Sequence, residues 1–174
     1  MKKLLTTLFA ILFSFNANAF VLSPHVGLDY VLSTANGYGD IDNLNGATVS
    51  AGVKALGFLS VEGYYQKYFL TTVSNGSKTK PTAYGIDLVA DTLNLGLVEL
   101  LTTVGYGKYN LDGGRLNSKM EEFENETYRI GFGVQFNPTD EIGIRAMYRW
   151  VIPEDDMFKK NVQELTIGLR YYFF

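Results

Sequence analysis

The chain has 174 residues, of which 47% are hydrophobic and 14% aromatic, and its formal net charge is −3. It contains no cysteine, which excludes disulfides and thiolate metal sites, and it has no basic stripe of the kind that binds nucleic acid. After residue 19, no apolar run approaches the roughly 18 residues of a membrane-spanning helix, so the hydrophobic content needs another explanation.

The first 19 residues have the pattern of a secretory signal peptide. Lys2 and Lys3 form a short basic start, and residues 4–15 form an apolar run. Ala17-Asn18-Ala19 then supplies the small-x-small pattern that precedes cleavage. We therefore expect a signal peptide over residues 1–19 and a mature chain of one domain over residues 20–174.

From residue 20 onward, stretches that alternate between apolar and polar residues are separated by turn residues. The eight predicted strands are Val21–Ser33, Gly46–Lys54, Phe58–Phe69, Ala83–Asp91, Glu99–Tyr109, Tyr128–Phe136, Glu141–Trp150 and Glu164–Phe174. Four long connections alternate with three short ones, and the least clear of the short turns covers residues 92–98. This pattern predicts an all-β fold, an eight-stranded antiparallel up-and-down transmembrane β-barrel.

A soluble lipocalin-like barrel would show the same alternation but would keep its apolar face inside. Three features favour a membrane barrel, and the first is the glycine-rich polar face, because small residues suit a crowded lumen. These glycines are at positions 27, 52, 85, 105, 107, 131, 133, 143 and 168. The second is a set of aromatic residues near strand ends on the apolar face, namely Tyr30, Tyr84, Tyr106, Tyr128, Tyr148, Trp150, Tyr171 and Phe173. The third is that the chain stops on its last strand, whereas lipocalins typically add a helix.

The last strand carries a resemblance to a known family. Thr166, Gly168, Tyr171 and Phe173 match the terminal signal of outer-membrane barrels, with Phe174 one residue beyond the usual end. Over its mature length the chain resembles the small eight-stranded outer-membrane barrels of the OmpA/OmpX and opacity-protein type. The resemblance implies a bacterial outer membrane location, contact with membrane lipid and lipopolysaccharide, and insertion by a barrel-assembly machinery that recognises these residues. A monomer is expected.

Charged residues on the polar face predict an ion network inside the barrel. Its expected members are Asp29, Lys54, Glu62, Asp87, Glu99, Arg129, Glu141, Arg145, Arg149, Glu164 and Arg170. They fall at three approximate depths, each of which mixes signs. Because an unpaired charge away from water costs several kcal/mol, we expect ion pairs that plug the lumen, with Arg145 bridging Asp29 or Asp87.

Catalytic and metal sites are not expected. Some enzymes of the resembled family, the lipid A palmitoyltransferases and deacylases, need a serine activated by a histidine. His25 is the single histidine and lies at the start of the first strand, so we interpret it as a rim residue without a catalytic task. Two acidic groups, Asp40 with Asp42 and Glu121 to Glu126, lack a calcium-loop spacing and are interpreted as solvated loop charge. No cofactor is expected.

Three functional hypotheses remain. The leading one is a non-enzymatic outer-membrane barrel, a structural surface protein whose external loops mediate adhesion or recognition. The second is a narrow, porin-like channel for ions or very small solutes, and the third is a lipid A-modifying enzyme. For the loop residues Tyr38, Phe123, Met157 and Phe158, two interpretations stay open: a contact surface for a host or phage ligand, or packing on one another.

Overall fold

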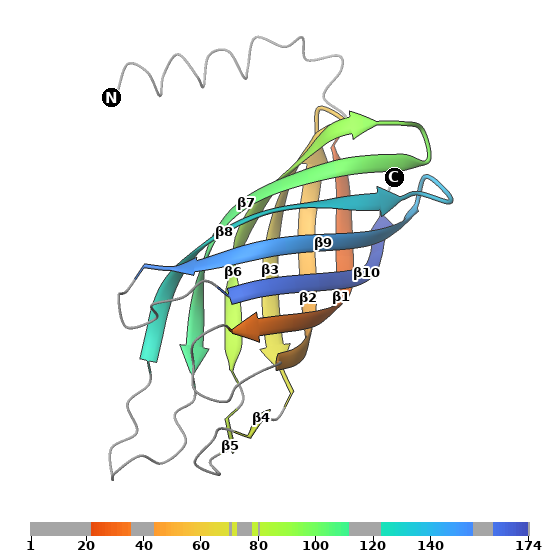
Figure 1. The fold of residues 1–174 in the computed structure, drawn as a ribbon. Coiled ribbons are helices and arrows are strands. Elements are labelled where there is room, and N and C mark those ends of the chain that lie inside the picture. The colour runs from red at the N-terminus through yellow and green to blue at the C-terminus, as the bar shows by residue number, and fades with distance from the viewer. Residues whose placement is uncertain are drawn as a thin grey trace, which may run out of the picture.

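Eight long strands close into one antiparallel β-barrel (Figure 1). The computed structural model describes residues 22–35, 44–69, 71–72, 78–79, 81–111, 123–154 and 162–173. The barrel strands are β1 (Ser23–Ala35), β2 (Leu44–Ala55), β3 (Leu59–Tyr68), β6 (Thr82–Asn94), β7 (Val98–Leu111), β8 (Phe123–Phe136), β9 (Ile142–Pro153) and β10 (Val162–Tyr172). Each pairs with its neighbours along the chain, and β1 pairs with β10 to close the barrel. This confirms the predicted fold class.

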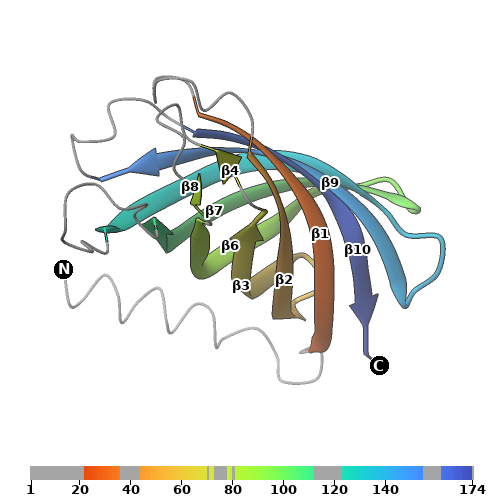
Figure 2. The ribbon, with the colours of Figure 1, turned by 90° about the horizontal axis from the view of Figure 1, so that it is seen from below.

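The two ends of the barrel differ in their connections (Figure 2). One end, called the turn end here, holds the short turns 56–58, 95–97 and 137–141 together with the start of β1 and the end of β10. The opposite, loop end holds the four long connections. One of them contains a small hairpin of β4 (Thr71–Thr72) and β5 (Lys78–Thr79), which the sequence pattern did not predict.

The turn between β6 and β7 is shorter than predicted. β6 continues to Asn94 through a β-bulge between Asp91 and Leu93, which leaves only residues 95–97 outside the strands. Thr92 lies in the bulge, and its hydroxyl donates a hydrogen bond to the carbonyl of Leu100 at 3.0 Å. An extra residue breaks the period of two, and for this reason alternation alone ended the strand too early.

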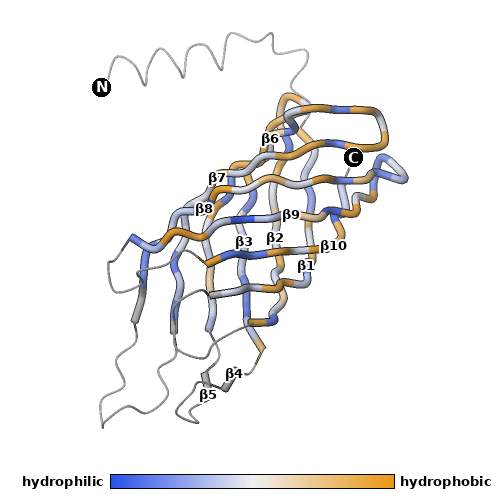
Figure 3. Tube along the Cα trace, viewed as in Figure 1, coloured by the Kyte–Doolittle hydropathy of each residue, from blue (hydrophilic) through white to orange (hydrophobic). Residues whose placement is uncertain are grey.

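Side chains alternate between a buried lumen face and an exposed apolar face along every barrel strand. Large apolar residues on the outer face are about half exposed, for example Leu28 at 58%, Ile86 at 60% and Ile167 at 58%. Figure 3 shows the alternation as a change of colour from residue to residue along the strands. Within the described part of the chain, no helix has the length and apolarity needed to cross a membrane.

Aromatic side chains on the outer face gather in two bands, because the strand register brings them to similar levels. The loop-end band contains Tyr65, Tyr84, Tyr106, Tyr128 and Trp150, and the turn-end band contains Phe58, Phe136, Tyr171 and Phe173. Within the first band, the rings of Tyr106 and Tyr128 contact each other in a tilted arrangement, with centroids 5.6 Å apart. Two such bands around an apolar belt are what a barrel presents to the two interfaces of a bilayer.

Two glycines on the lumen face lie opposite charged lumen side chains. Gly27 is the register partner of Arg170, and Gly168 is the partner of Asp29. A Cβ atom at either glycine would overlap the charged group of that partner. The sequence predicts that small residues suit the crowded lumen. At these two positions the reason is that glycine leaves the space that a neighbouring charged side chain fills.

Candidate functional site

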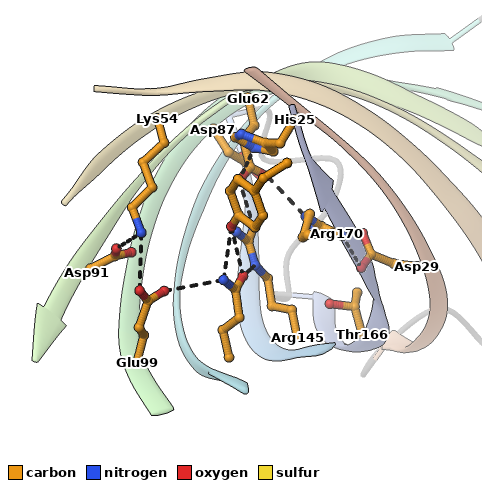
Figure 4. Close-up of polar contacts among 12 residues, drawn as sticks. His25, Asp29, Lys54, Glu62, Asp87, Asp91, Glu99, Arg145, Thr166 and Arg170 are labelled. Carbon is orange, nitrogen blue, oxygen red and sulfur yellow. Dashed lines mark hydrogen bonds and ion pairs between the residues drawn. The ribbon is translucent and has the colours of Figure 1, made fainter. Parts of the chain in front are cut away.

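Charged residues inside the barrel form three groups, stacked from the turn end to the loop end. The turn-end group is Lys54, Asp91 and Glu99. The middle group is His25, Asp29, Glu62, Arg145 and Arg170, and the loop-end group is Asp87, Arg129, Arg149 and Glu164. They come from all eight barrel strands, so the contacts cross the lumen in several directions (Figure 4).

The turn-end group is centred on the ammonium group of Lys54, on β2. Its Nζ atom lies 2.5 Å from the Asp91 carboxylate on β6 and 3.2 Å from Glu99 on β7. The second Glu99 oxygen accepts a hydrogen bond from the Gln135 side chain at 3.3 Å. One cation thus faces two anions, and the polar side chain of Gln135 connects this group to the next.

The middle group holds short ion pairs whose side chains are more deeply buried than those of the turn-end group. Arg170 donates to both carboxylate oxygens of Asp29, at 2.8 and 3.0 Å, in the paired geometry that favours arginine over lysine. Arg145 donates to Glu62 at 2.7 Å and to Gln135 at 2.8 Å. His25 Nε2 lies 3.1 Å from the same Glu62 oxygen. Glu62 therefore collects contacts from β1 and β9 while it is itself only 2% exposed.

The loop-end group is looser. Arg129 lies between Asp87 at 3.4 Å and Glu164 at 3.3 Å, and its guanidinium carbon stands 4.0 Å from the centre of the Tyr64 ring. Arg149 donates to Thr166 at 3.1 Å and approaches Asp87 only to 3.8 Å. Because these distances exceed those in the middle group, we expect the loop-end group to contribute less to stability.

Glu164 also anchors the loop end of the lumen through neutral partners. It accepts hydrogen bonds from the Tyr68 hydroxyl at 2.6 Å and from Gln66 at 2.8 Å. Next to these contacts, Tyr68 packs with Val31 and Leu44 in a buried apolar cluster. The lumen at this end is therefore filled by a mixture of aromatic, aliphatic and hydrogen-bonded polar side chains.

A chain of side-chain contacts crosses the whole lumen at the middle level. It runs from Asp29 to Arg170 and Glu62, then to Arg145 and Gln135. Tyr172 completes it by accepting a hydrogen bond from Gln135 at 2.9 Å. On the turn-end side, a cavity of about 360 Å³ lined by Lys54, Glu99, Gln135 and Tyr172 opens toward solvent and ends at this chain.

Every predicted member of the network except Glu141 faces the lumen. Glu141 is a correction: it is exposed in the turn before Ile142, where β9 begins, so it is not one of the buried charges of the lumen. The predicted bridge from Arg145 to Asp29 or Asp87 is also wrong. Arg145 pairs with Glu62, because the tilt of the strands offsets β9 from β1 and β6 and brings it level with β3.

Sequence reasoning missed three participants. Asp91 faces the lumen and takes the place of Glu141 as the sixth anion. His25 is not a free rim residue, since it is 1% exposed and reaches Glu62 through the space left by Gly52. Gln135 joins two of the groups. The sequence feature that could have identified these three residues is their position on the polar face of their strands.

The terminal residues predicted as an insertion signal occupy two faces of β10. Tyr171 and Phe173 are outward, 48% and 47% exposed, with their rings 5.1 Å apart. Thr166 and Gly168 face the lumen, where Thr166 accepts the hydrogen bond from Arg149. Phe174 lies outside the described residues.

Several loop predictions also lie outside the described residues. These are Asp40, Asp42, Glu121, Glu122, Tyr38, Met157 and Phe158, together with the side chains of Phe123 and Glu124. In the part of the chain that the structure describes, no group of three or more histidine, cysteine or carboxylate side chains could hold a metal ion.

Comparison with known proteins identifies the fold. No protein-family model matches the chain, and no curated protein sequence matches it. Among solved structures, neisserial surface protein A aligns with a TM-score of 0.63 and 15% identity over 87% of this chain and 97% of that one. The N-terminal barrel domain of Pseudomonas aeruginosa OprF gives 0.62 and 12%, over 86% and 97%.

A third similar structure is Ail, the attachment invasion locus protein of Yersinia pestis. It aligns with a TM-score of 0.55 and 19% identity over 87% of this chain and 97% of that one. All three are small eight-stranded outer-membrane barrels. The chain described here has the fold of that class.

Proposed function

We propose that this chain is a non-enzymatic barrel of the bacterial outer membrane, a structural surface protein that displays loops above a closed lumen. The observation that carries the proposal is the chain of contacts from Asp29 to Tyr172, which crosses the lumen at its middle level. A permeable tube needs a continuous water path, whereas this level is occupied by paired arginine and carboxylate side chains. The apolar outer face and its two aromatic bands support a position in a bilayer.

The surroundings of His25 support a non-enzymatic role. An acyl-transfer or hydrolytic site would need the histidine beside a serine hydroxyl. The two ring nitrogens of His25 face the Glu62 carboxylate at 3.1 Å and the backbone carbonyl of Ser23 at 3.5 Å. These contacts commit the only histidine of the chain to the middle group of the lumen network.

The proposed location implies a set of partners. The belt would contact membrane lipid and, in the outer leaflet, lipopolysaccharide. A barrel-assembly machinery would recognise the last strand through Thr166, Gly168, Tyr171, Phe173 and Phe174. The signal peptide over residues 1–19 would direct the chain across the inner membrane first.

We further propose adhesion or recognition of a host or phage ligand by the external loops. A solved barrel of the same fold is named for attachment and invasion, which makes host surfaces the first ligands to test. The experiment measures binding of the purified barrel to candidate host surfaces, with variants that lack one long loop each. Equal binding by the wild type and all loop-deletion variants would reject recognition through the loops.

Conductance in a planar bilayer tests the closed lumen and separates the proposal from a narrow channel. We expect no stepwise current from the folded wild-type barrel in potassium chloride. A variant with both Arg145→Ala and Glu62→Ala serves as the matched control. It removes one ion pair of the contact chain, and because it removes one positive and one negative charge, the net charge of the lumen is unchanged. Reproducible wild-type channels would favour the porin-like hypothesis.

A lipid A mass spectrum from cells that express the barrel tests the enzyme hypothesis.

A further inference from the structure

The three turns at the turn end differ sharply in chemistry although they are neighbours. The β8–β9 turn, residues 137–141, is polar and ends with the exposed carboxylates of Asp140 and Glu141. The β2–β3 and β6–β7 turns carry large apolar side chains instead. Backbone hydrogen bonds link neighbouring elements at this end. Asp91 N on β6 donates to Phe58 O of the β2–β3 turn at 2.7 Å, and Asn137 N of the β8–β9 turn donates to Leu97 O of the β6–β7 turn at 2.8 Å.

The apolar side chains of these two turns form what we call the turn-end apolar surface: Leu56, Phe58, Leu93, Leu95 and Leu97. Leu95 is 65% exposed, the highest value among the described large hydrophobic residues, and Leu97 is 59% exposed. In Figure 3 the β6–β7 hairpin is mostly orange up to its tip. Such a patch in water would be a liability, so it indicates an apolar partner.

Leu56 supplies a second, independent observation. Its φ is 57°, in the left-handed region, and the next residue, Gly57, has a φ of 71°. Two consecutive positive φ values are typical of type I′ turns, which favour Asn-Gly because a leucine side chain is strained there. The local backbone therefore disfavours leucine at position 56, so the turn itself does not account for a leucine there.

The turn-end apolar surface continues the lipid-facing belt without an interruption by charge. Val61 on β3, Leu88 on β6 and Leu100 on β7 are outward residues of the belt and are 51%, 40% and 37% exposed. The polar side chain of Asn94 turns back on the hairpin, donating to Glu99 at 3.3 Å and accepting from Gly96 N at 2.8 Å. The hairpin thus satisfies the polar side chain of Asn94 internally. Its inner side, with Asn94, Gly96 and Leu97, borders the turn-end cavity that opens toward solvent, so only its outer side can meet lipid.

We propose that the turn-end apolar surface lies within the lipid of the leaflet at that end. Where the barrel wall is formed by β2, β3, β6 and β7, the lipid then covers Phe58 and Leu95. At the β8–β9 turn the lipid ends before Asp140, which stays in water. This difference tilts the barrel axis in the membrane toward the apolar turns. The inference rests on the proposed membrane-barrel function and adds which surface at the turn end the lipid covers.

Tryptophan fluorescence tests this placement. Four variants are made in a Trp150→Phe background, which removes the only native tryptophan: Leu97→Trp, Leu95→Trp, Asp140→Trp and Phe132→Trp. Each is folded into phosphatidylcholine vesicles with plain or brominated acyl chains, and folding is verified by heat-modifiable migration. We expect Leu97→Trp and Leu95→Trp to lose most of their emission in brominated lipid. Asp140→Trp should instead be quenched by aqueous acrylamide.

Phe132→Trp, in the middle of the belt, distinguishes failure of the inference from failure of the proposed function. If its emission survives brominated lipid, the barrel does not span the bilayer and both proposals fail. If it is quenched while Leu97→Trp and Leu95→Trp respond only to acrylamide, the turn-end apolar surface is in water and this inference alone is overturned. Shielding of both leucine positions from lipid and acrylamide would also overturn it, in favour of a protein partner or a second copy.

Discussion

At the scale of single residues, the space beside each lumen charge is as important as the charge itself. Gly105 lies opposite Asp87, and a Cβ atom there would overlap the Asp87 carboxylate and lie 3.0 Å from the carbonyl of Ile86. Gly63 differs, because it lies at an exposed, outward position of β3. The nearest atom to an added Cβ there would be the carbonyl oxygen of Ala51, at 3.8 Å. The two glycines are thus a matched pair for testing lumen packing.

We expect Gly105→Ala to lower the free energy of unfolding by about 1–3 kcal/mol, since the added methyl group forces Asp87 out of its place beside Arg129. Gly63→Ala should leave stability unchanged or slightly higher, because it restricts the unfolded chain without a clash. Urea titration of both variants in lipid vesicles measures the difference. Equal losses from the two substitutions would contradict the role of lumen space.

Arg145 is the residue whose loss we expect to be most damaging to the lumen. Arg145→Ala removes the donor to Glu62 at 2.7 Å and to Gln135 at 2.8 Å, and it leaves a buried carboxylate with weaker partners. We expect a loss of about 3–5 kcal/mol in the free energy of unfolding, which is typical of breaking a buried ion pair.

Arg149→Ala is the control for Arg145→Ala. Its guanidinium group is equally buried, but it approaches Asp87 only to 3.8 Å and donates to a neutral hydroxyl. The same urea titration should therefore show a smaller loss. If Arg149→Ala proves the more damaging substitution, short ion-pair distances do not determine the stability of the lumen.

At the scale of the element, the two faces of β10 differ in character. Its inward side supplies Arg170 and Glu164 to the lumen groups, and its outward side ends with Tyr171 and Phe173, whose rings meet edge to face. The outward rings are about half exposed, whereas the inward charges are buried. The proposed recognition of this strand during assembly can therefore be tested separately from its contribution to stability.

Deletion of Phe173 and Phe174 should prevent assembly in cells while leaving folding into detergent or lipid vesicles largely intact. The reason is that Phe173 follows the last register pair of β10, His25 with Tyr172, and contributes one backbone hydrogen bond, from its N–H to the carbonyl of Pro24 at 2.8 Å, and a ring contact with Tyr171. The measurement compares heat-modifiable barrel in isolated outer membranes with barrel refolded in vitro. Phe132→Ala, which removes an outward aromatic ring from β8, is the control and should assemble. Normal amounts of the truncated barrel in the membrane would exclude the signal.

The sequence predicts the elements well and their contacts poorly, for a physical reason. Alternation with a period of two is a local property, so it identifies each strand and the face on which Asp29 or Arg145 lies. Which charge meets which depends on how far each strand is offset from strands across the lumen, and this offset is a property of the closed barrel. The Arg145–Glu62 pair follows from that offset, and no local pattern indicates it.

At the scale of the whole molecule, the first test is of export. We expect cleavage between Ala19 and Phe20, because Ala17-Asn18-Ala19 follows an apolar run of suitable length. N-terminal sequencing of protein isolated from the outer membrane measures the cleavage site. An Ala19→Lys variant should accumulate uncleaved, since a large charged residue does not fit a small-residue site. Membrane material that begins at Met1 would contradict the export route.

The closure of β1 against β10 also determines when the barrel can fold. Asp29 and Arg170 are 141 residues apart in the chain, and Ser33 and Glu164 are 131 apart. During synthesis, the first strand is therefore complete long before its final partner exists. A sheet still open at β1 would expose unpaired backbone groups and an uncompensated Asp29, and hydrocarbon tolerates neither. In the proposed membrane location, the early strands must consequently stay out of the hydrocarbon until the last strand is available to close the sheet.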